Sequence, residues 1–133
     1  MTIQLTRRAA LGLVAGGLVV PFMPAAASAE TLRSGALEGT AGHTATGSVS
    51  IVKEGDAINV VFSNDYSLDN APDPYVAFGD GSAYADGTDF VKMKSLKGAQ
   101  TYSLPGNIDH SDYSAVWLWC RRFGVPLAFA PLS

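Results

Sequence analysis

Alternation of apolar and polar residues is the feature that most limits the fold of this chain. After residue 30, no window repeats apolar residues at the three- and four-residue spacing of a long amphipathic helix. Instead the side chains alternate: Val49 and Ile51 stand between serine and lysine residues, and the run from Ile58 to Phe62 alternates again. A period of two is typical of strands with one buried face.

Turn residues separate the alternating runs. Glu54-Gly55-Asp56 separates the first two, which predicts a hairpin. Pro126 indicates an edge strand or the start of a strand. Short strands separated by turns predict an all-β fold, a compact antiparallel β-sandwich or barrel-like domain. We expect further strands over residues 75–78, 91–94, 101–104, 115–121 and 125–130.

The N-terminal segment has the order of an export signal. Arg7-Arg8 precedes an uncharged apolar stretch over residues 9–20, and an Ala-Ser-Ala cleavage site follows at 27–29. The paired arginines resemble the twin-arginine type of signal. We therefore expect a twin-arginine signal peptide at 1–29 and one β domain at 30–133, which would work in the periplasm or be secreted.

The composition changes once this segment is set aside. Of the 133 residues, 47% are hydrophobic and 16% charged, and much of the apolar excess lies in the signal. Its loss leaves seven basic residues against twelve acidic ones, a net charge of −5. Because a nucleic-acid binder is expected to be basic, we predict no nucleic-acid partner. Glycines and prolines interrupt the apolar stretch, so no stable membrane span is expected in the mature form.

Charge is unevenly distributed along the mature chain. The segment from Glu54 to Val91 holds eight acidic residues and no lysine or arginine, whereas residues 92–133 hold five basic residues and two acidic ones. Such runs are typical of solvated loops. A cation site or a docking face for a basic partner is the alternative, and both interpretations stay open here.

Cys120 is the only cysteine, so the chain cannot form an internal disulfide. Strand alternation places its thiol on one face with Val116 and Leu118. If that face is the core, the thiol packs as a small hydrophobe. The adjacent Arg121-Arg122 pair could instead favour a reactive thiolate, which keeps a redox role open.

The opposite face of the same strand is expected to carry Trp117, Trp119 and Arg121. We expect the two indoles to stack along the strand, with Arg121 placed for a cation–π contact. Indole rings often cover the second face of a sandwich, where their N–H needs a partner. An exposed pair would instead suggest an electron-relay or carbohydrate-stacking surface.

A blue-type copper site needs a cysteine, two histidines and often a methionine. The chain offers His43, His110, Cys120 and Met93, but arginines stand where a close downstream histidine is usual. Haem attachment through Cys-x-x-Cys-His is excluded. We therefore predict no specific cofactor, and an absorption spectrum of freshly exported protein would distinguish a bare thiol from bound copper or haem.

The run from Asp109 to Asp112 packs hydrolase-type residues into one turn. A catalytic triad needs such groups to converge from separate segments, so this run does not predict a hydrolase. Asp109 is expected instead to cap or close a turn before Tyr113.

Several blocks of the sequence occur in a characteristic order: Gly-His-Thr at 42–44 with Gly47, Asn-Ala-Pro-Asp-Pro-Tyr-Val at 70–76, Leu-Lys-Gly and Gln-Thr-Tyr-Ser-Leu-Pro within 96–105, the run 108–116, and Trp-Cys-Arg-Arg-Phe at 119–123. In this order they resemble the DM13 domain, also called electron transfer DM13, over about residues 35–132. Two departures fall in one turn, where Ala71 stands in place of a common glycine and Pro74 interrupts the segment.

The resemblance implies a compact, exported β domain with a family-characteristic cysteine proposed to take part in redox chemistry. By position, that cysteine is Cys120. The leading hypothesis is a redox or electron-transfer accessory domain, rather than a stand-alone enzyme, that works with a redox partner protein. The supporting residues would be Trp117, Trp119, Arg121, Asp73 and Asp109. The alternative is a non-catalytic binding module that uses its loops or the acidic 54–91 segment, with Cys120 as core packing.

Overall fold

The computed structural model describes residues 28–81 and 83–133. Within these ranges the regular structure is antiparallel β-strand, apart from one 3-10 turn, η2 (His110–Asp112). The predicted all-β fold is therefore confirmed. The expected signal peptide falls almost wholly on residues 1–27, which lie outside the described residues.

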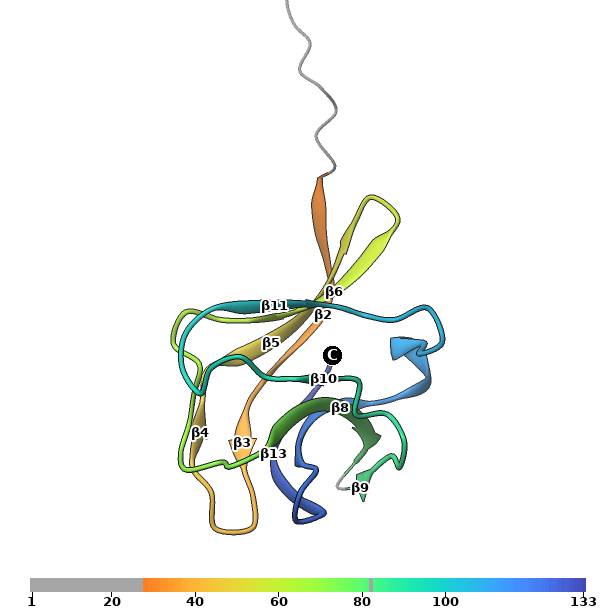
Figure 1. Ribbon diagram of the computed structural model, residues 1–133. Helices are drawn as coiled ribbons and strands as arrows, with labels where there is room; N and C mark the ends of the chain where they lie inside the picture. The colour runs from red at the N-terminus through yellow and green to blue at the C-terminus, as the bar shows by residue number, and fades with distance from the viewer. Residues whose placement is uncertain (1–27, 82) are drawn as a thin grey trace, which may run out of the picture.

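Two main sheets form the layers of the molecule (Figure 1). The β5 sheet has the order β11-β6-β5-β2, with β2 (Ala29–Ala36), β5 (Ser48–Glu54), β6 (Ala57–Phe62) and β11 (Gln100–Ser103). The β12 sheet has the order β10-β8-β12-β13-β3, and β9 also pairs with β8. Its strands are β3 (Glu38–Gly39), β8 (Pro74–Asp80), β9 (Ala83–Tyr84), β10 (Val91–Lys92), β12 (Ala115–Cys120) and β13 (Val125–Pro131). A small third sheet pairs β4 (Ala45–Thr46) with β7 (Ser67–Leu68).

The first predicted hairpin forms as expected. β5 and β6 pair antiparallel, with Val49 opposite Phe62 and Ile51 opposite Val60. Their connection turns at Gly55, whose φ of 62° lies in the region that glycine adopts at little cost. The four apolar residues are fully buried, so alternation and turn chemistry act together to fix the register.

Five strands that the pattern did not predict complete the sheets. β2 covers the outer edge of the β5 sheet, and most of its side chains are exposed. An edge strand buries too little to need a regular apolar alternation, so its sequence carries no clear strand signal. The other four, β3, β4, β7 and β9, have two residues each, too few for a period to be visible.

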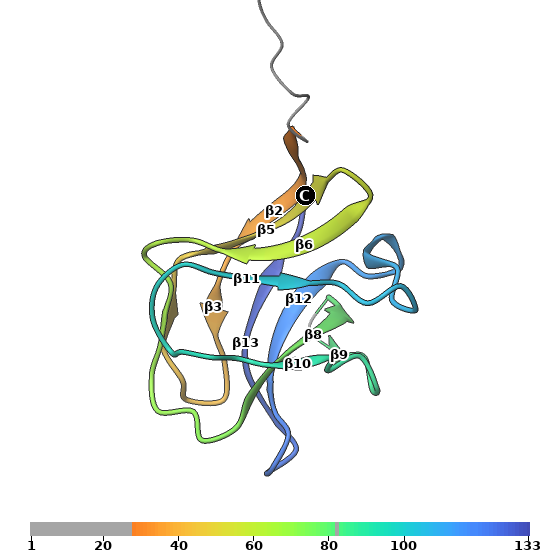
Figure 2. The ribbon, with the colours of Figure 1, turned by 45° about the horizontal axis from the view of Figure 1, so that its top comes forward.

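The main core lies between the two sheets. Its largest fully buried side chains come from both layers: Ile51, Val60 and Phe62 from the β5 sheet, Val76, Phe78, Val116, Leu118 and Leu127 from the β12 sheet, and Tyr66 and Leu68 from the segment between β6 and β8. In Figure 2 the strands β8, β12 and β13 run side by side beneath β2, β5 and β6. This packing leaves the other face of the β12 sheet turned away from the core.

Pro126 occupies the position that its chemistry predicts. It is the second residue of β13 and lies opposite Trp119, just past a register shift between Leu118 and Trp119. On its other side β13 pairs with β3 only at Ala128 and Phe129. Because no ladder bond is needed from Pro126, the strand tolerates it near its start.

The part of the chain that the structure describes contains no helix long and apolar enough to cross a membrane.

Candidate functional site around the end of β12

Cys120 is the last residue of β12, and its side chain is fully buried. It shares the main apolar cluster with Val116 and Leu118, which confirms the face predicted from alternation. In the sheet it lies opposite Pro74 on β8 and Val125 on β13. The end of β12 is thus paired on both sides, and the thiol points into the core.

An exposed turn begins one residue after the thiol. Residues 121–124 connect β12 to β13 and form the hairpin end at the bottom of Figure 2. Phe123 is 62% exposed at this turn, and Gly124 has a φ of 61°. The Gly124 N–H donates to the Cys120 carbonyl at 2.8 Å, so the turn holds the strand end closed. Because the sulfur is fully buried, a reagent reaches it only when the structure opens.

The outer face of the β12 sheet carries rings from four strands, β8, β9, β12 and β13. We call the set Tyr75, Tyr84, Trp117, Trp119 and Phe129 the outer aromatic face. Trp117 stacks on its cross-strand neighbour Phe129, with ring centroids 4.9 Å apart. A Cβ added to Gly79 would lie 2.4 Å from Trp117 Nε1, so the indole lies directly against the glycine. Within the described residues Trp117 Nε1 has no hydrogen-bond partner.

Trp119 stacks on Tyr84 of β9, with centroids 3.8 Å apart and an interplanar angle of 8°. The expectation that the two indoles stack along the strand is therefore wrong. Trp117 pairs with a ring from the adjacent strand β13, and Trp119 pairs with a ring from β9, which lies on the far side of β8. Trp117 and Phe129 are direct cross-strand neighbours, which lie closer together than residues two apart on one strand.

Arg121 is fixed by an acid and a ring. Its Nε donates to Asp89 Oδ2 at 2.8 Å, and its Nη2 donates to the Asp89 carbonyl at 3.2 Å. The guanidinium carbon lies 3.8 Å from the centroid of Tyr75. The predicted cation–π contact thus exists, but Tyr75 supplies the ring rather than a tryptophan.

Tyr84 and Asp89 form the polar part of the same cluster. Tyr84 Oη donates to Asp89 Oδ1 at 3.0 Å. Burial and the hydrogen bond to Asp89 raise the pKa of Tyr84 to about 12. Burial by itself would raise the pKa of Asp89, but the hydrogen bonds from Arg121 and Tyr84 outweigh it and lower the pKa below its usual value. The carboxylate is therefore held in its charged form.

Asp73 also lies beside the strand end. Its carboxylate forms an ion pair with Lys92 Nζ at 3.2 Å, and its carbonyl accepts a hydrogen bond from the Arg121 N–H at 3.2 Å. Two acids of the 54–91 segment, Asp73 and Asp89, thus pair with basic residues that follow it. Part of the charge asymmetry along the chain is neutralised in the fold.

Asp109 belongs to a different place. It precedes η2, the turn that leads into the start of β12, whereas Cys120 ends that strand. Its Oδ1 accepts from the Ser111 N–H at 2.9 Å and from Ser111 Oγ at 2.6 Å, which lowers the pKa of Asp109. Asp109 therefore caps the turn, as predicted. Arg33 ties this turn to β2 by donating to the carbonyls of His110 and Tyr113.

The four residues considered for copper have separate surroundings. His43 Nδ1 lies 3.2 Å from Asp69 Oδ1, and Met93 Sδ accepts a hydrogen bond from Tyr66 Oη at 3.3 Å. His110 is in η2, and Cys120 is in the core. Among the described residues, no three His, Cys, Asp or Glu side chains are grouped to hold a metal.

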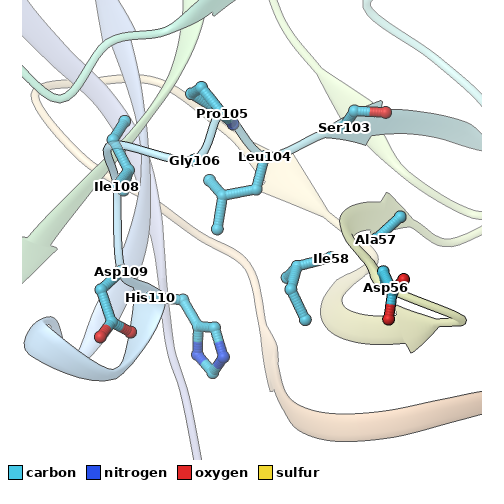
Figure 3. A pocket seen from close by; sticks show the side chains of 10 residues that line it. All are labelled: Asp56, Ala57, Ile58, Ser103, Leu104, Pro105, Gly106, Ile108, Asp109 and His110. Atoms are coloured by element: carbon cyan, nitrogen blue, oxygen red, sulfur yellow. The ribbon is translucent and has the colours of Figure 1, made fainter.

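A cleft of about 480 Å³ opens between the β5–β6 turn and the segment from β11 to η2. Figure 3 shows Ile58 and Leu104 lying between His110 on one side and Asp56 on the other. The residues that line it are Asp56, Ala57, Ile58, Ser103, Leu104, Pro105, Gly106, Ile108, Asp109 and His110. Cys120 does not line this cleft, which is a concave surface separate from the end of β12.

The structure therefore gathers Cys120, Trp119, Arg121 and Asp73 at one end of β12, places Trp117 further along the strand, and leaves Asp109 at the other end. Tyr84 and Asp89 join the first group, although no sequence pattern predicted them as site residues. Their only signal was membership of the acidic segment, and their partners Trp119 and Arg121 are more than 30 residues away in the chain.

The fold and this cluster define a small antiparallel β domain with one enclosed thiol and an aromatic outer face. Comparison with known families gives a match to the family described as Electron transfer DM13 over residues 37–132. The chain belongs to the DM13 family, and the resemblance read from its motifs is confirmed. No curated protein and no solved structure matches it.

Proposed function

We propose that the chain is an extracytoplasmic accessory domain that exchanges electrons with a redox partner protein, with Cys120 as its redox group. The observation that carries the proposal is the position of the single cysteine, at the last residue of β12 and one residue before an exposed turn. The family description as an electron-transfer domain supports it. The signal peptide expected at 1–29, of twin-arginine type, supports work outside the cytoplasm.

The chemistry follows from there being one thiol. Without a second cysteine, two-electron oxidation of Cys120 ends in a mixed disulfide with a partner or in a sulfenic acid. In the first case the thiolate attacks a partner disulfide, one S–S bond forms, one breaks, and a partner thiolate leaves. Both routes require the end of β12 to open. Trp119 and Arg121 hold this strand end through Tyr84 and Asp89, so they control how the thiol is presented.

The experiment compares the mature protein with Cys120→Ser. We expect the wild type to show a thiol-dependent midpoint potential in a redox titration and to exchange electrons with a thiol–disulfide oxidoreductase. The Cys120→Ser variant should lose both signals while it keeps the far-UV spectrum of the wild type. Lys53→Ala, which removes an exposed positive charge from β5 in the other sheet, is the control and should keep both. An unreactive thiol, together with unchanged electron exchange in Cys120→Ser, overturns the proposal.

A second candidate function has its own supporting observation, which is the complete burial of Cys120 among apolar side chains. In this account the thiol is core packing, and the chain is a non-catalytic binding module that uses its loops, its acidic segment or the cleft beside His110. Cys120→Ala would then cost only stability, about 1 kcal/mol. Loss of partner exchange in a Cys120→Ala variant that keeps the wild-type fold contradicts this account.

A further inference from the structure

The contact between Tyr84 and Trp119 is the closest aromatic stack among the described residues, with centroids 3.8 Å apart and rings within 8° of parallel. The two rings come from different strands, β9 and β12, so tertiary structure holds them together. Both are half-buried and reach the surface of the outer aromatic face. Face-to-face overlap at this distance lets an electron pass between the two π-systems without an intervening group.

Tyr84 also has a proton acceptor in place. An oxidised phenol is strongly acidic, so its proton has to leave when the electron leaves. Tyr84 Oη already donates to a carboxylate oxygen of Asp89 at 3.0 Å. By contrast, Tyr66 donates to the sulfur of Met93, and Tyr102 donates to the side-chain oxygen of Gln100. Within residues 28–81 and 83–133, Tyr84 is the tyrosine whose hydroxyl is bonded to a carboxylate.

Arg121 keeps that carboxylate aimed at the phenol. It binds the second oxygen, Oδ2, at 2.8 Å and the backbone carbonyl of Asp89 at 3.2 Å, which leaves Oδ1 for Tyr84. The Asp89 side chain is only 14% exposed, so water competes weakly for it. The hydrogen bonds lower the pKa of Asp89 and keep it as an anion that can accept a proton.

We propose that Tyr84 is a redox-active residue that passes its electron through Trp119 to a one-electron oxidant and its proton to Asp89. The inference rests on the proposed function in one respect, that the domain exchanges electrons with a partner. The oxidant belongs to the class of oxidised metal centres that redox proteins carry, and it accepts the electron from Trp119, which is partly exposed.

Electrons and protons balance in two steps. First, the oxidant takes one electron from the Trp119 indole, which becomes a radical cation while the oxidant is reduced by one electron. Then Tyr84 gives one electron to Trp119 and one proton to Asp89, so the indole returns to its neutral form. The products are a neutral tyrosyl radical, a protonated Asp89 carboxyl and the reduced oxidant. Return of one electron to the phenoxyl oxygen and one proton from Asp89 restores the starting state.

A purely structural role predicts a different outcome. The same bonds would then only fasten residues 83–90 onto β12, and removing them would change stability but not the site of oxidation. The readout must therefore be the identity and yield of a radical, which a structural role does not set.

The test is photo-oxidation of the mature protein by a flash-generated ruthenium(III) polypyridyl complex, followed by electron paramagnetic resonance and transient absorption. We expect a tyrosyl radical in the wild type. In Tyr84→Phe the yield of tyrosyl radical should be lower by about tenfold or more, and the indole radical of Trp119 should persist instead. Trp119→Phe keeps the stack but removes the oxidisable indole, so it should lower the tyrosyl yield. Asp89→Asn should slow tyrosyl formation by about tenfold or more, because the proton acceptor is lost.

Tyr113→Phe is the matched control, since this ring packs on Phe78 in the main core, and it should leave the radical yield unchanged. Near-UV circular dichroism checks that each variant keeps its packing. If Asp89→Asn disturbs the fold, Asp89→Glu replaces it as the test, because it keeps a carboxylate and should form the tyrosyl radical at the wild-type rate. An unchanged tyrosyl radical in Tyr84→Phe overturns the inference. An unchanged rate in folded Asp89→Asn overturns the role of Asp89 as proton acceptor.

Repeating the flash experiment in Cys120→Ser separates this inference from the proposed function. A Tyr84 radical that forms in Cys120→Ser, with no thiol-dependent exchange in the wild type, leaves the relay standing and removes the cysteine role. Thiol-dependent exchange without a Tyr84 radical removes only the relay.

Discussion

The two faces of β12, a strand of six residues, have different surroundings. On the inner face Val116, Leu118 and Cys120 meet apolar side chains of the opposite sheet and are closed to water. On the outer face Trp117 and Trp119 meet aromatic rings, and polar and charged groups reach the rim of the cluster. The inner face therefore supplies stability, whereas the outer face carries the aromatic and charged groups of the proposed electron relay. Because side chains alternate between the two faces, one short strand can carry both sets of residues.

The largest expected effect is on the inner face. Leu118→Ala removes a fully buried side chain between two sheets, and we expect the free energy of unfolding to fall by about 3 kcal/mol. Urea denaturation followed by far-UV circular dichroism measures it. A matched truncation on the outer face, Trp119→Leu, should cost clearly less because Trp119 is partly exposed. Equal losses would show that the two faces do not differ as described.

The second-largest effect is expected at Gly79, on the outer face of the β12 sheet. Gly79→Ala would place a Cβ 2.2 Å from the Ala83 carbonyl and 2.4 Å from Trp117 Nε1, so the backbone of β9 and the indole must both shift. We expect a loss of about 2 kcal/mol and a changed near-UV tryptophan signal. Gly106→Ala is the control, because a Cβ added there would have no atom within 4 Å. Gly81→Ala is less suitable because the positive φ of Gly81 would strain an alanine. If Gly79→Ala folds with the stability and the near-UV spectrum of the wild type, Gly79 and Trp117 do not lie in close contact.

Two substitutions of Cys120 test whether the surroundings of its side chain are apolar or polar. Cys120→Ala should cost about 1 kcal/mol through lost packing. Cys120→Ser keeps the volume but buries a hydroxyl, and the cost should reach about 2 kcal/mol because the site offers mainly apolar neighbours. Thermal unfolding of the two variants in parallel gives the order. A serine variant more stable than the alanine variant would indicate a hydrogen-bond partner at the thiol position.

The smallest effect concerns pH on the outer face. The pKa of Tyr84 rises to about 12 in the folded chain, against about 10 when unfolded. The folded state holds the phenol proton more tightly, so this contribution to stability is complete below about pH 10 and is lost as the pH rises towards 12. Tyr84→Phe should therefore show a shallower alkaline loss of melting temperature. The same slope in Tyr84→Phe and wild type would contradict the link between Tyr84 and alkaline stability.

The residues of the inner face could be predicted from the sequence because the alternation of apolar and polar residues is a local property. The hairpin at Gly55, the face of Cys120 and the cap at Asp109 all depend on neighbours within a few residues. The outer cluster depends on pairings across the sheet, such as Tyr84 with Trp119 and Asp89 with Arg121. No local pattern specifies which distant strand supplies the partner, so these contacts needed the fold.

The most direct test of the account is the rate at which Cys120 reacts with an alkylating thiol reagent under native conditions, measured as urea is added below the unfolding transition. A redox group gated by the end of β12 reacts through local opening, so the rate should change little with urea and should rise in Arg121→Ala, which loses the tie to Asp89. If the rate instead falls to that of global unfolding and follows its full urea dependence, with no effect of Arg121→Ala, the thiol is core packing and the proposed redox role of Cys120 is wrong.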